Sequence, residues 1–260
     1  MAFRFALITG ATSGIGEALA RALPAETGLL LTGRDGIRLA ALKAELGSQA
    51  RPVKTLVADL AEEAGREAVI AAAAEQPLDL LINNAGLGQT GRVIDNTLER
   101  EREMAEVNVI APVVLTRALL PGMIETARSE RRRAGVIVVA SIMAFQPAPF
   151  MATYAASKAF DLHYAEALAA ELVNDPVDVL ALCPGGTKTR FGERAGIDGG
   201  KTGLWDRPER VAREALAALG RRPVHVVGGR NRVVTSLPRI LPRQAVTAIF
   251  RRALSGMGQS

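Results

Sequence analysis

The chain has 260 residues, of which 48% are hydrophobic and 23% are charged, a composition that excludes intrinsic disorder and allows one domain with a large core. Its formal net charge of +5 suits an anionic ligand, but only 4% of the residues are aromatic and the basic residues are spread along the chain, so we expect no nucleic-acid partner. We expect a single domain over residues 1–260, in which residues 230–260 form a basic, amphipathic C-terminal extension.

Short apolar runs alternate with Ala- and Leu-rich stretches of helical periodicity along the chain. We predict strands at Phe3–Thr9, Gly28–Thr32, Pro52–Ala58, Leu78–Asn83, Gly135–Ser141, Val177–Cys183 and Pro223–Gly229. We predict helices at Gly14–Leu23, Asp35–Gly47, Ala61–Glu75, Leu98–Thr126, Thr153–Val173 and Arg207–Leu219. Strands that read as continuous apolar runs indicate a sheet covered on both faces. The pattern therefore predicts an α/β fold, a Rossmann-like doubly wound three-layer sandwich with a parallel sheet of about seven strands.

A glycine-rich turn connects the first predicted strand to the first predicted helix. Gly10 permits a tight turn, Gly14 lets the backbone approach a pyrophosphate, and Gly16 lets the helix pack closely on the strand. The unpaired N–H groups and the dipole of the helix then face the anion. We expect this turn to bind a dinucleotide cofactor through Gly10, Thr12, Ser13, Gly14, Ile15 and Gly16.

The end of the second predicted strand bears on the choice between NAD(H) and NADP(H). An acidic side chain there would bind the ribose 2′-hydroxyl of NAD, whereas an arginine accommodates the 2′-phosphate of NADP. The chain has Gly33 at the strand end, followed by Arg34 and Asp35. We expect NADP(H) to be preferred over NAD(H), with Arg34 as the phosphate contact and Arg38 as a second candidate; Asp35 leaves the NAD alternative open.

Further motifs follow in order along the chain: Asp59-Leu60, Asn83-Asn84-Ala85-Gly86, Asn108, Ser141, Tyr154-Ala155-Ala156-Ser157-Lys158 and Pro184-Gly185-Gly186-Thr187-Lys188-Thr189. Together with the glycine turn they closely resemble the short-chain dehydrogenase/reductase family. The resemblance covers about residues 3–189 and the last strand, and Thr187 is a mild departure where the family often has an aliphatic residue. It implies cofactor contacts from Asp59, Leu60, Asn83, Ala85, Gly86, Tyr154, Lys158, Pro184, Gly185, Thr187 and Thr189.

Four residues are candidates for the chemistry of hydride transfer between a carbonyl and an alcohol. Tyr154 and Lys158 are four positions apart and share one face of a helix, where the ammonium would favour the phenolate and make Tyr154 the general acid/base. Ser141, at a strand end, would stabilise charge on the substrate oxygen. By resemblance, Lys158 also binds the nicotinamide ribose and Asn108 holds a water that links Lys158 to solvent. The alternative is a catalytically idle NADP(H)-sensing protein with the same fold.

Apolar residues flank the predicted site. Leu87, Met143, Phe145, Phe150, Phe191 and Trp205 are candidates for the substrate side, which indicates an apolar ketone, 3-oxoacyl or steroid-like substrate. The glycine-rich segment Gly185–Trp205 suits a lid over the bound cofactor. His163 and His225 are too scattered for a metal site, and we expect none.

The remaining expectations concern assembly and location. The lone Cys183 fits a reducing compartment, and the N-terminal apolar run is too short for a signal peptide, so we expect a cytoplasmic protein. We expect a homo-oligomer, a dimer or tetramer, although the extension beyond Gly229 departs from many relatives. The basic amphipathic tail has three candidate placements: on its own domain, at a subunit contact, or on an anionic membrane surface as a peripheral contact.

Overall fold

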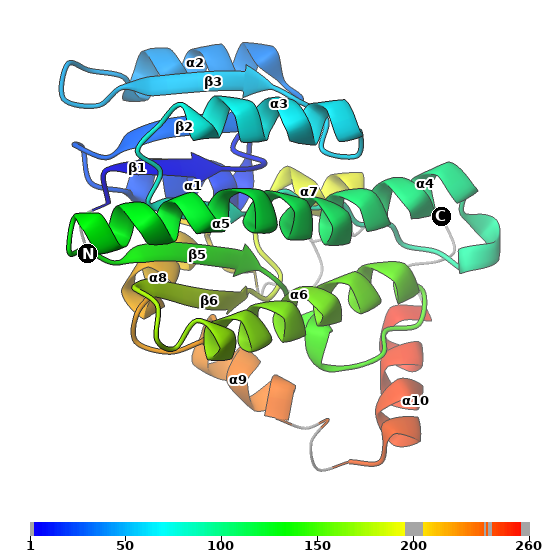
Figure 1. Ribbon diagram of the computed structural model, residues 1–260. Helices are drawn as coiled ribbons and strands as arrows, with labels where there is room; N and C mark the ends of the chain where they lie inside the picture. Colours follow the sequence, from blue (N-terminus) through cyan, green and yellow to red (C-terminus); the bar gives the residue numbers. More distant parts are fainter. Residues whose placement is uncertain (1–2, 196–204, 237, 239–240, 256–260) are drawn as a thin grey trace.

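A parallel sheet of seven strands forms the centre of the computed structural model, which describes residues 3–195, 205–236, 238 and 241–255 (Figure 1). The order across the sheet is β3-β2-β1-β4-β5-β6-β7. The strands are β1 (Phe5–Ile8), β2 (Gly28–Gly33), β3 (Val53–Val57), β4 (Leu80–Asn83), β5 (Ala134–Val139), β6 (Val177–Cys183) and β7 (Val224–Val226). The predicted doubly wound parallel sheet is confirmed, and its order reverses between β1 and β4, where such folds bind ligands.

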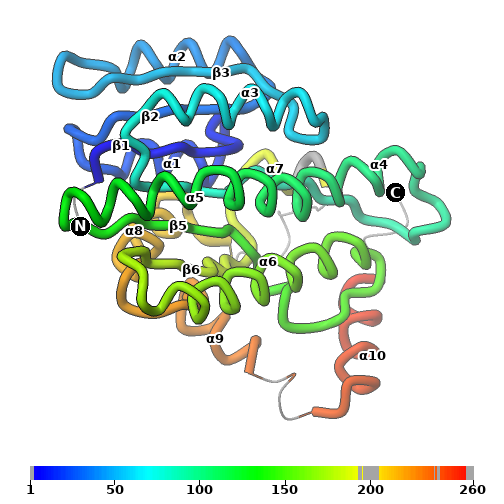
Figure 2. The backbone as a smooth tube through the Cα atoms, viewed as in Figure 1, coloured from blue at the N-terminus to red at the C-terminus, as the bar shows by residue number. Residues whose placement is uncertain are grey.

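Helices cover both faces of the sheet. One face packs against α3 (Glu63–Ala74), α5 (Ala111–Ser129) and α6 (Ala152–Glu171), and the other against α1 (Gly14–Ala22), α2 (Gly36–Leu46) and α8 (Pro208–Ala218). Both layers can be followed along the backbone in Figure 2. In β1, Leu7 points into the first core and Ile8 into the second, because successive strand residues face opposite sides. Both side chains are fully buried, which explains the continuous apolar strands.

The predicted helix at Leu98–Thr126 is interrupted by a π-helical turn. The segment comprises α4 (Leu98–Ala105), the π-turn η2 (Glu106–Ile110) and α5, which continues to Ser129. An inserted π-turn adds a residue to the helix and rotates the side chains that follow it. By length and composition, Leu98–Ser129 could cross a membrane, but half of its apolar window is buried, as in a core helix of a folded domain.

The described part of the C-terminal extension contains the helices α9 (Gly229–Ser236) and α10 (Arg243–Leu254), and Pro242 is the N-cap of α10. Val246 and Leu254 of α10 are buried. Leu254 belongs to an apolar cluster with Leu87, Met151 and Tyr154. The extension therefore packs on its own domain through one face of α10, while Ile249 on the same helix is exposed.

Candidate active site

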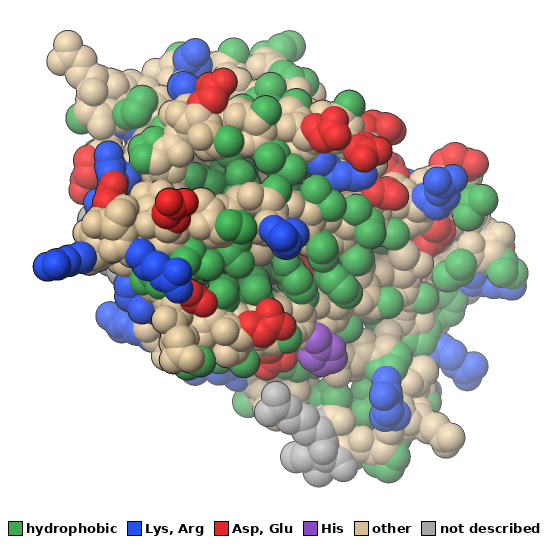
Figure 3. All heavy atoms as spheres, viewed as in Figure 1, with side chains coloured by type: hydrophobic (Ala, Val, Ile, Leu, Met, Phe, Trp, Pro, Cys, Tyr) green, Lys and Arg blue, Asp and Glu red, His purple; other side chains and the backbone are tan. Residues whose placement is uncertain are grey.

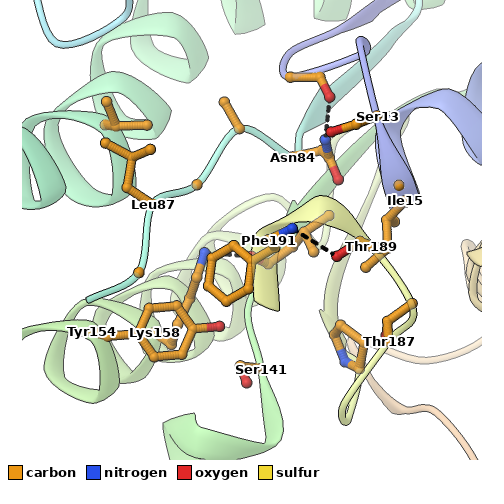
Figure 4. A pocket seen from close by; sticks show the side chains of 18 of the residues that line it. Ser13, Ile15, Asn84, Leu87, Ser141, Tyr154, Lys158, Thr187, Thr189 and Phe191 are labelled. Carbon is orange, nitrogen blue, oxygen red and sulfur yellow. Dashed lines mark hydrogen bonds between the residues drawn. The ribbon is translucent and has the colours of Figure 1, made fainter. Parts of the chain in front are cut away.

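A cavity of about 420 Å³ opens at the carboxyl edge of the sheet, where β1, β4, β5 and β6 end. Most of the predicted site residues line it: Gly10, Thr12, Ser13, Gly14, Ile15, Arg34, Asp59, Leu60, Ala85, Gly86, Ser141, Tyr154, Lys158, Pro184, Gly185, Thr187 and Thr189. Figure 4 shows several of these side chains around the cavity. Gly16, Asn83 and Asn108 are not among its lining residues.

The glycine turn forms a cradle at the N-terminus of α1. Gly10 and Gly14 have φ angles of +63° and +60°, a region that favours glycine. A Cβ atom on Gly16 would lie 2.4 Å from the carbonyl oxygen of Gly10, so Gly16 lets the helix approach the turn. Ser13, the N-cap of α1, makes no side-chain capping bond and lines the cavity with Gly14 and Ile15. This exposed helix terminus fits the pyrophosphate of a dinucleotide.

Asn84 rather than Asn83 faces the cavity. The Asn83 side chain donates to Thr116 Oγ1 at 3.0 Å and thus joins β4 to α5, on the face of the sheet that also packs against α3 and α6. Asn84 lies just beyond the strand, and its Nδ2 donates to Thr9 O at 2.8 Å and Gly10 O at 3.2 Å. The Asn83 side chain thus contacts α5 and does not line the cavity, and the cofactor contact expected from Asn83 stays a prediction. The Asn84 side chain instead holds the backbone of the glycine turn through the carbonyl groups of Thr9 and Gly10.

Arg34 lies at the rim of the cavity in an acidic setting. Its Nη1 contacts Glu103 Oε1 at 2.7 Å and Asp59 Oδ2 at 3.4 Å, and 47% of its side chain is exposed. Asp35 also lines the cavity, but its carboxylate caps α2 by accepting a bond from the backbone N–H of Arg38. The Arg38 guanidinium pairs with Glu17 and Glu45 and does not line the cavity, so only Arg34 of the two arginines is placed to meet a ligand.

Tyr154, Ser141 and Lys158 converge on one wall of the cavity. Ser141 N-caps the short helix η3 (Ile142–Phe145): its Oγ accepts from the backbone N–H of Met143 at 3.1 Å. Its hydroxyl hydrogen remains available to the Tyr154 oxygen, and this interaction lowers the pKa of the phenol. The ring of Phe191 lies 5.4 Å from the ring of Tyr154. Both side chains are drawn in Figure 4. The phenol, the hydroxyl and the ammonium thus line one wall of the cavity, next to the apolar ring of Phe191.

Burial is the largest influence on the pKa values of Tyr154 and Lys158. It raises the pKa of Tyr154, and the lowering by Lys158 and the Ser141 bond does not outweigh it. The expectation that Lys158 brings the phenol closer to neutral pH is thus right in the sign of its effect but wrong for the net shift. Burial also lowers the pKa of Lys158, but Asp161 and Tyr154 overcome this, so the net pKa is raised. Lys158 therefore stays charged.

Asn108 lies in the π-turn, fully buried behind the cavity. Its Nδ2 donates to Leu87 O and to Ser157 Oγ, both at 2.9 Å, and its Oδ1 accepts from Leu87 N at 2.8 Å. With these bonds the side chain fixes the backbone of Leu87 and the helix that carries Tyr154. A water held by the Asn108 side chain, as the resemblance implies, would have to share atoms that are already bonded.

The outer wall of the cavity is apolar. Of the predicted substrate-side residues, Leu87, Met143, Phe191 and Trp205 line it, whereas Phe145 and Phe150 do not. Phe145 packs against the core between sheet and α6, and Phe150 has a φ angle of +66° in the turn before α6. Phe191 is on α7 (Arg190–Arg194), part of the predicted lid segment; residues 196–204 of that segment lie outside the described residues. Val107, Ile142, Met151 and Leu254 also line the cavity.

The remaining reactive side chains lie elsewhere. Within the described residues no His, Cys, Asp and Glu cluster could hold a metal ion. His225 contacts Glu214 Oε2 at 2.8 Å, which fits the structural role expected for it. Burial raises the pKa of the Cys183 thiol to about 12, so it is not a nucleophile at neutral pH. Asp161, which forms an ion pair with Lys158, was not predicted as a site residue. Its spacing of three residues from Lys158 on a helix could have indicated this ion pair.

Comparisons with known proteins agree with this geometry. The family model described as short chain dehydrogenase matches residues 4–198. "Dehydrogenase/reductase SDR family member 7B" of Bos taurus is 36% identical over 242 residues, which cover 85% of this chain and 72% of the relative. "1-deoxy-11-beta-hydroxypentalenate dehydrogenase" of Streptomyces exfoliatus is 39% identical over 191 residues, which cover 72% of this chain and 68% of the relative.

Solved structures share the whole fold. One solved structure comes from work on the stereoselectivity of 7beta-hydroxysteroid dehydrogenase. It superposes with a TM-score of 0.82 at 26% identity, and the match covers 95% of this chain and 96% of the other chain. A short-chain dehydrogenase from Sphingobium yanoikuyae in complex with NADPH gives 0.79 at 30% identity, covering 94% of each chain. The chain therefore belongs to the short-chain dehydrogenase/reductase family, whose members are oxidoreductases that use a nicotinamide dinucleotide.

Proposed function

We propose that this protein is an NADP(H)-preferring enzyme that interconverts an apolar ketone and its secondary alcohol. The observation that carries the proposal is the convergence of Tyr154, Ser141 and Lys158 on a cavity that also holds the glycine cradle and Arg34. A dinucleotide that lies in the cradle therefore reaches the same cavity as the proton donor. Asp59, Leu60, Ala85, Gly86, Pro184, Gly185, Thr187 and Thr189 line the space between them and would contact its adenosine and nicotinamide halves.

In the proposed reduction, the Tyr154 hydroxyl donates its proton to the substrate oxygen. A nicotinamide bound in the cavity would supply the hydride to the carbonyl carbon, or would take it up in the oxidation. Ser141 Oγ is fixed by the backbone N–H of Met143, and when substrate binds its hydroxyl hydrogen turns from the Tyr154 oxygen to the substrate oxygen. Lys158 remains charged and stabilises the phenolate that proton donation leaves behind. Asn108 keeps Leu87 and α6 in register around the reacting atoms.

The walls of the cavity support a bulky, apolar substrate. Leu87, Met143, Met151, Phe191, Trp205 and Leu254 line it, while Ser141 and Tyr154 offer polar groups for one oxygen. Relatives named for a hydroxysteroid and for 1-deoxy-11-beta-hydroxypentalenate fit this assignment. We therefore place the substrate among ring-containing or long-chain ketones with one reacting carbonyl; steroid-like and 3-oxoacyl compounds are the first to screen.

Arg34 supports the preference for NADP(H). Its guanidinium borders the cavity and is partly neutralised by Glu103 and Asp59, whose place a 2′-phosphate could take. Structural relatives bind either form: the Sphingobium yanoikuyae protein was solved with NADPH, and a 3-ketoacyl-(acyl-carrier-protein) reductase from Brucella melitensis, at a TM-score of 0.76 and 27% identity, with NADH. The preference therefore rests on Arg34 of this chain.

Turnover by the wild type and by Tyr154→Phe tests the assignment. We expect NADPH oxidation with an apolar ketone panel, and a loss of at least about 100-fold in kcat for the variant, the range for removal of a positioned acid/base. Tyr164→Phe is the matched control, because Tyr164 is the only other tyrosine in the chain and lies on the same helix outside the cavity lining. Equal turnover of Tyr154→Phe and wild type would refute the role of Tyr154.

The rival proposal is an idle, NADP(H)-sensing protein. It requires tight cofactor binding without turnover on any ketone or alcohol of a broad panel. Because Tyr154, Ser141, Lys158 and Asn108 are all present and the first three converge on the cavity, we favour the enzyme.

Assembly and location complete the proposal. We propose a cytoplasmic homo-oligomer in which the exposed apolar surface of α5 and α6, visible in Figure 3, joins subunits. This surface includes Ile110 and the stacked rings of Phe160 and Tyr164. Because α10 uses its buried face on its own domain, peripheral membrane contact through the tail is the less favoured alternative. Light scattering tests the first point, and vesicle sedimentation the second.

A further inference from the structure

A buried ion pair stands directly behind the proposed proton donor. Lys158 Nζ donates to Asp161 Oδ2 at 2.9 Å and to the backbone oxygen of Val139 at 2.8 Å. The side chains of Lys158 and Asp161 are only 6% and 2% exposed. An ammonium has three N–H donors, so two of them are fixed by groups behind the cavity and one remains for the cavity side.

Burying this ion pair costs free energy of folding unless the contact between the two charges offsets their loss of hydration. Taking a carboxylate out of water costs several kcal/mol even after relaxation. Asp161 Oδ1 has no hydrogen-bond partner among the described residues, so the Lys158 ammonium is the carboxylate's one recorded contact. Asp161 therefore acts mainly on Lys158.

We propose that Asp161 is a positioning residue that keeps the buried Lys158 ammonium charged and directed at Tyr154. The Val139 carbonyl and the Asp161 carboxylate accept two of the three N–H groups, which leaves the third for the cavity, where Gly86 and Tyr154 are lining residues. A Cβ on Gly86 would lie 3.5 Å from Lys158 Nζ, which places the ammonium in contact with the cavity floor. The effect of Asp161 on catalysis rests on the proposed function, whereas its effect on the charge of Lys158 does not.

The charges around the pair decide the sign of the effect. Tyr154 and Lys158 lie on α6, the helix that also carries Asp161, and they interact with its carboxylate. The Cys183 thiol lies opposite on β6, and Glu166 helps to raise the pKa of this thiol. Burial raises the pKa of Cys183 to about 12, so the thiol is neutral over the working range. Lys158 and Asp161 then sum to zero charge beside a neutral phenol. Without the carboxylate, an unpaired ammonium would be buried, and burial lowers its pKa.

Asp161→Asn tests the proposal, because the amide keeps the shape and an acceptor oxygen but removes the charge. Tyrosine labelled with ¹³C at Cζ and lysine labelled at Cε report both protons by NMR, and the second tyrosine, Tyr164, is an internal reference. Asp178→Asn is the matched control: it removes a carboxylate from the ion pair with Arg133 at the amino end of β6, on the opposite edge of the sheet. Asp161→Glu tests rescue by charge.

We expect the titration midpoint of Lys158 to fall by at least about one pH unit in Asp161→Asn, the lower end of the effect of a nearby opposite charge. It should stay in place in Asp178→Asn and recover at least half of the shift in Asp161→Glu. The high-pH limb of kcat/KM for reduction should move down by the same amount. Unchanged midpoints in folded Asp161→Asn would overturn the proposal. Since the NMR titration needs no substrate, it holds or fails independently of the proposed reaction.

Discussion

Replacing Arg34 by alanine should weaken NADPH binding selectively. A hydrogen bond to a charged group contributes about 1.5–3 kcal/mol, and the lower half of this range applies because 47% of the Arg34 side chain is exposed. About 1.5 kcal/mol corresponds to about a tenfold loss of affinity. Loss of the guanidinium also leaves the Glu103 and Asp59 carboxylates without this counter-ion, and their repulsion of a 2′-phosphate adds to the loss. We expect a 10- to 30-fold loss for NADPH, by this estimate.

NADH binding should change by less than about twofold, because NADH has no 2′-phosphate to lose a contact. Quenching of Trp205, the single tryptophan and a lining residue of the cavity, measures both affinities. Arg38→Ala is the control, since Arg38 is also an ion-paired residue at the start of α2 but does not line the cavity. An equal loss for both cofactors, or tighter binding of NADH by the wild type, would refute the assignment of Arg34.

Three further predictions follow from burial and close packing. Gly16→Ala should lower Tm and weaken both cofactors, because its Cβ would lie 2.4 Å from the Gly10 carbonyl oxygen; calorimetry with an unchanged Tm would contradict this. At pH 9 the pKa of about 12 leaves only about one Cys183 in a thousand as thiolate, so iodoacetamide should modify it only on unfolding, and rapid labelling of folded protein would be inconsistent. Ending the chain after Pro242 should lower Tm and raise KM without changing vesicle binding, since Leu254 leaves the cavity wall; loss of vesicle pelleting at constant Tm would favour a membrane role.

Sequence patterns predicted the sheet and most of the cavity because both depend on local signals. Seven apolar runs separated by helical periodicity leave few arrangements other than a doubly wound sheet. The glycine turn, Ser141 and the Tyr154–Lys158 spacing all stand at strand ends or on one helix face, so the topology brings them together. Their convergence could thus be anticipated without coordinates.

The features that the sequence did not predict depend on packing. Asn83 and Asn84 are chemically identical, and only the direction of β4 decides that Asn83 meets Thr116 while Asn84 meets the glycine turn. The π-turn at Glu106–Ile110 has the composition of an ordinary helix, and within it Asn108 bonds to Leu87 and Ser157, which lie far away in the sequence. Leu254 reaches the cavity only because of the path of the chain after Pro242.

The bonds between Asn84 and the glycine turn bear on the order in which the protein folds. Thr9 Oγ1 accepts from the backbone N–H groups of Asn84 and Ala85, and Asn84 Nδ2 returns to Thr9 O, across 75 or 76 positions of sequence. Contacts of such separation close a long loop, which costs chain entropy and requires both segments to be present. The cofactor cradle therefore matures only after β4 has been synthesised and inserted beside β1, and an N-terminal fragment that ends before β4 would hold the glycine motif without its support.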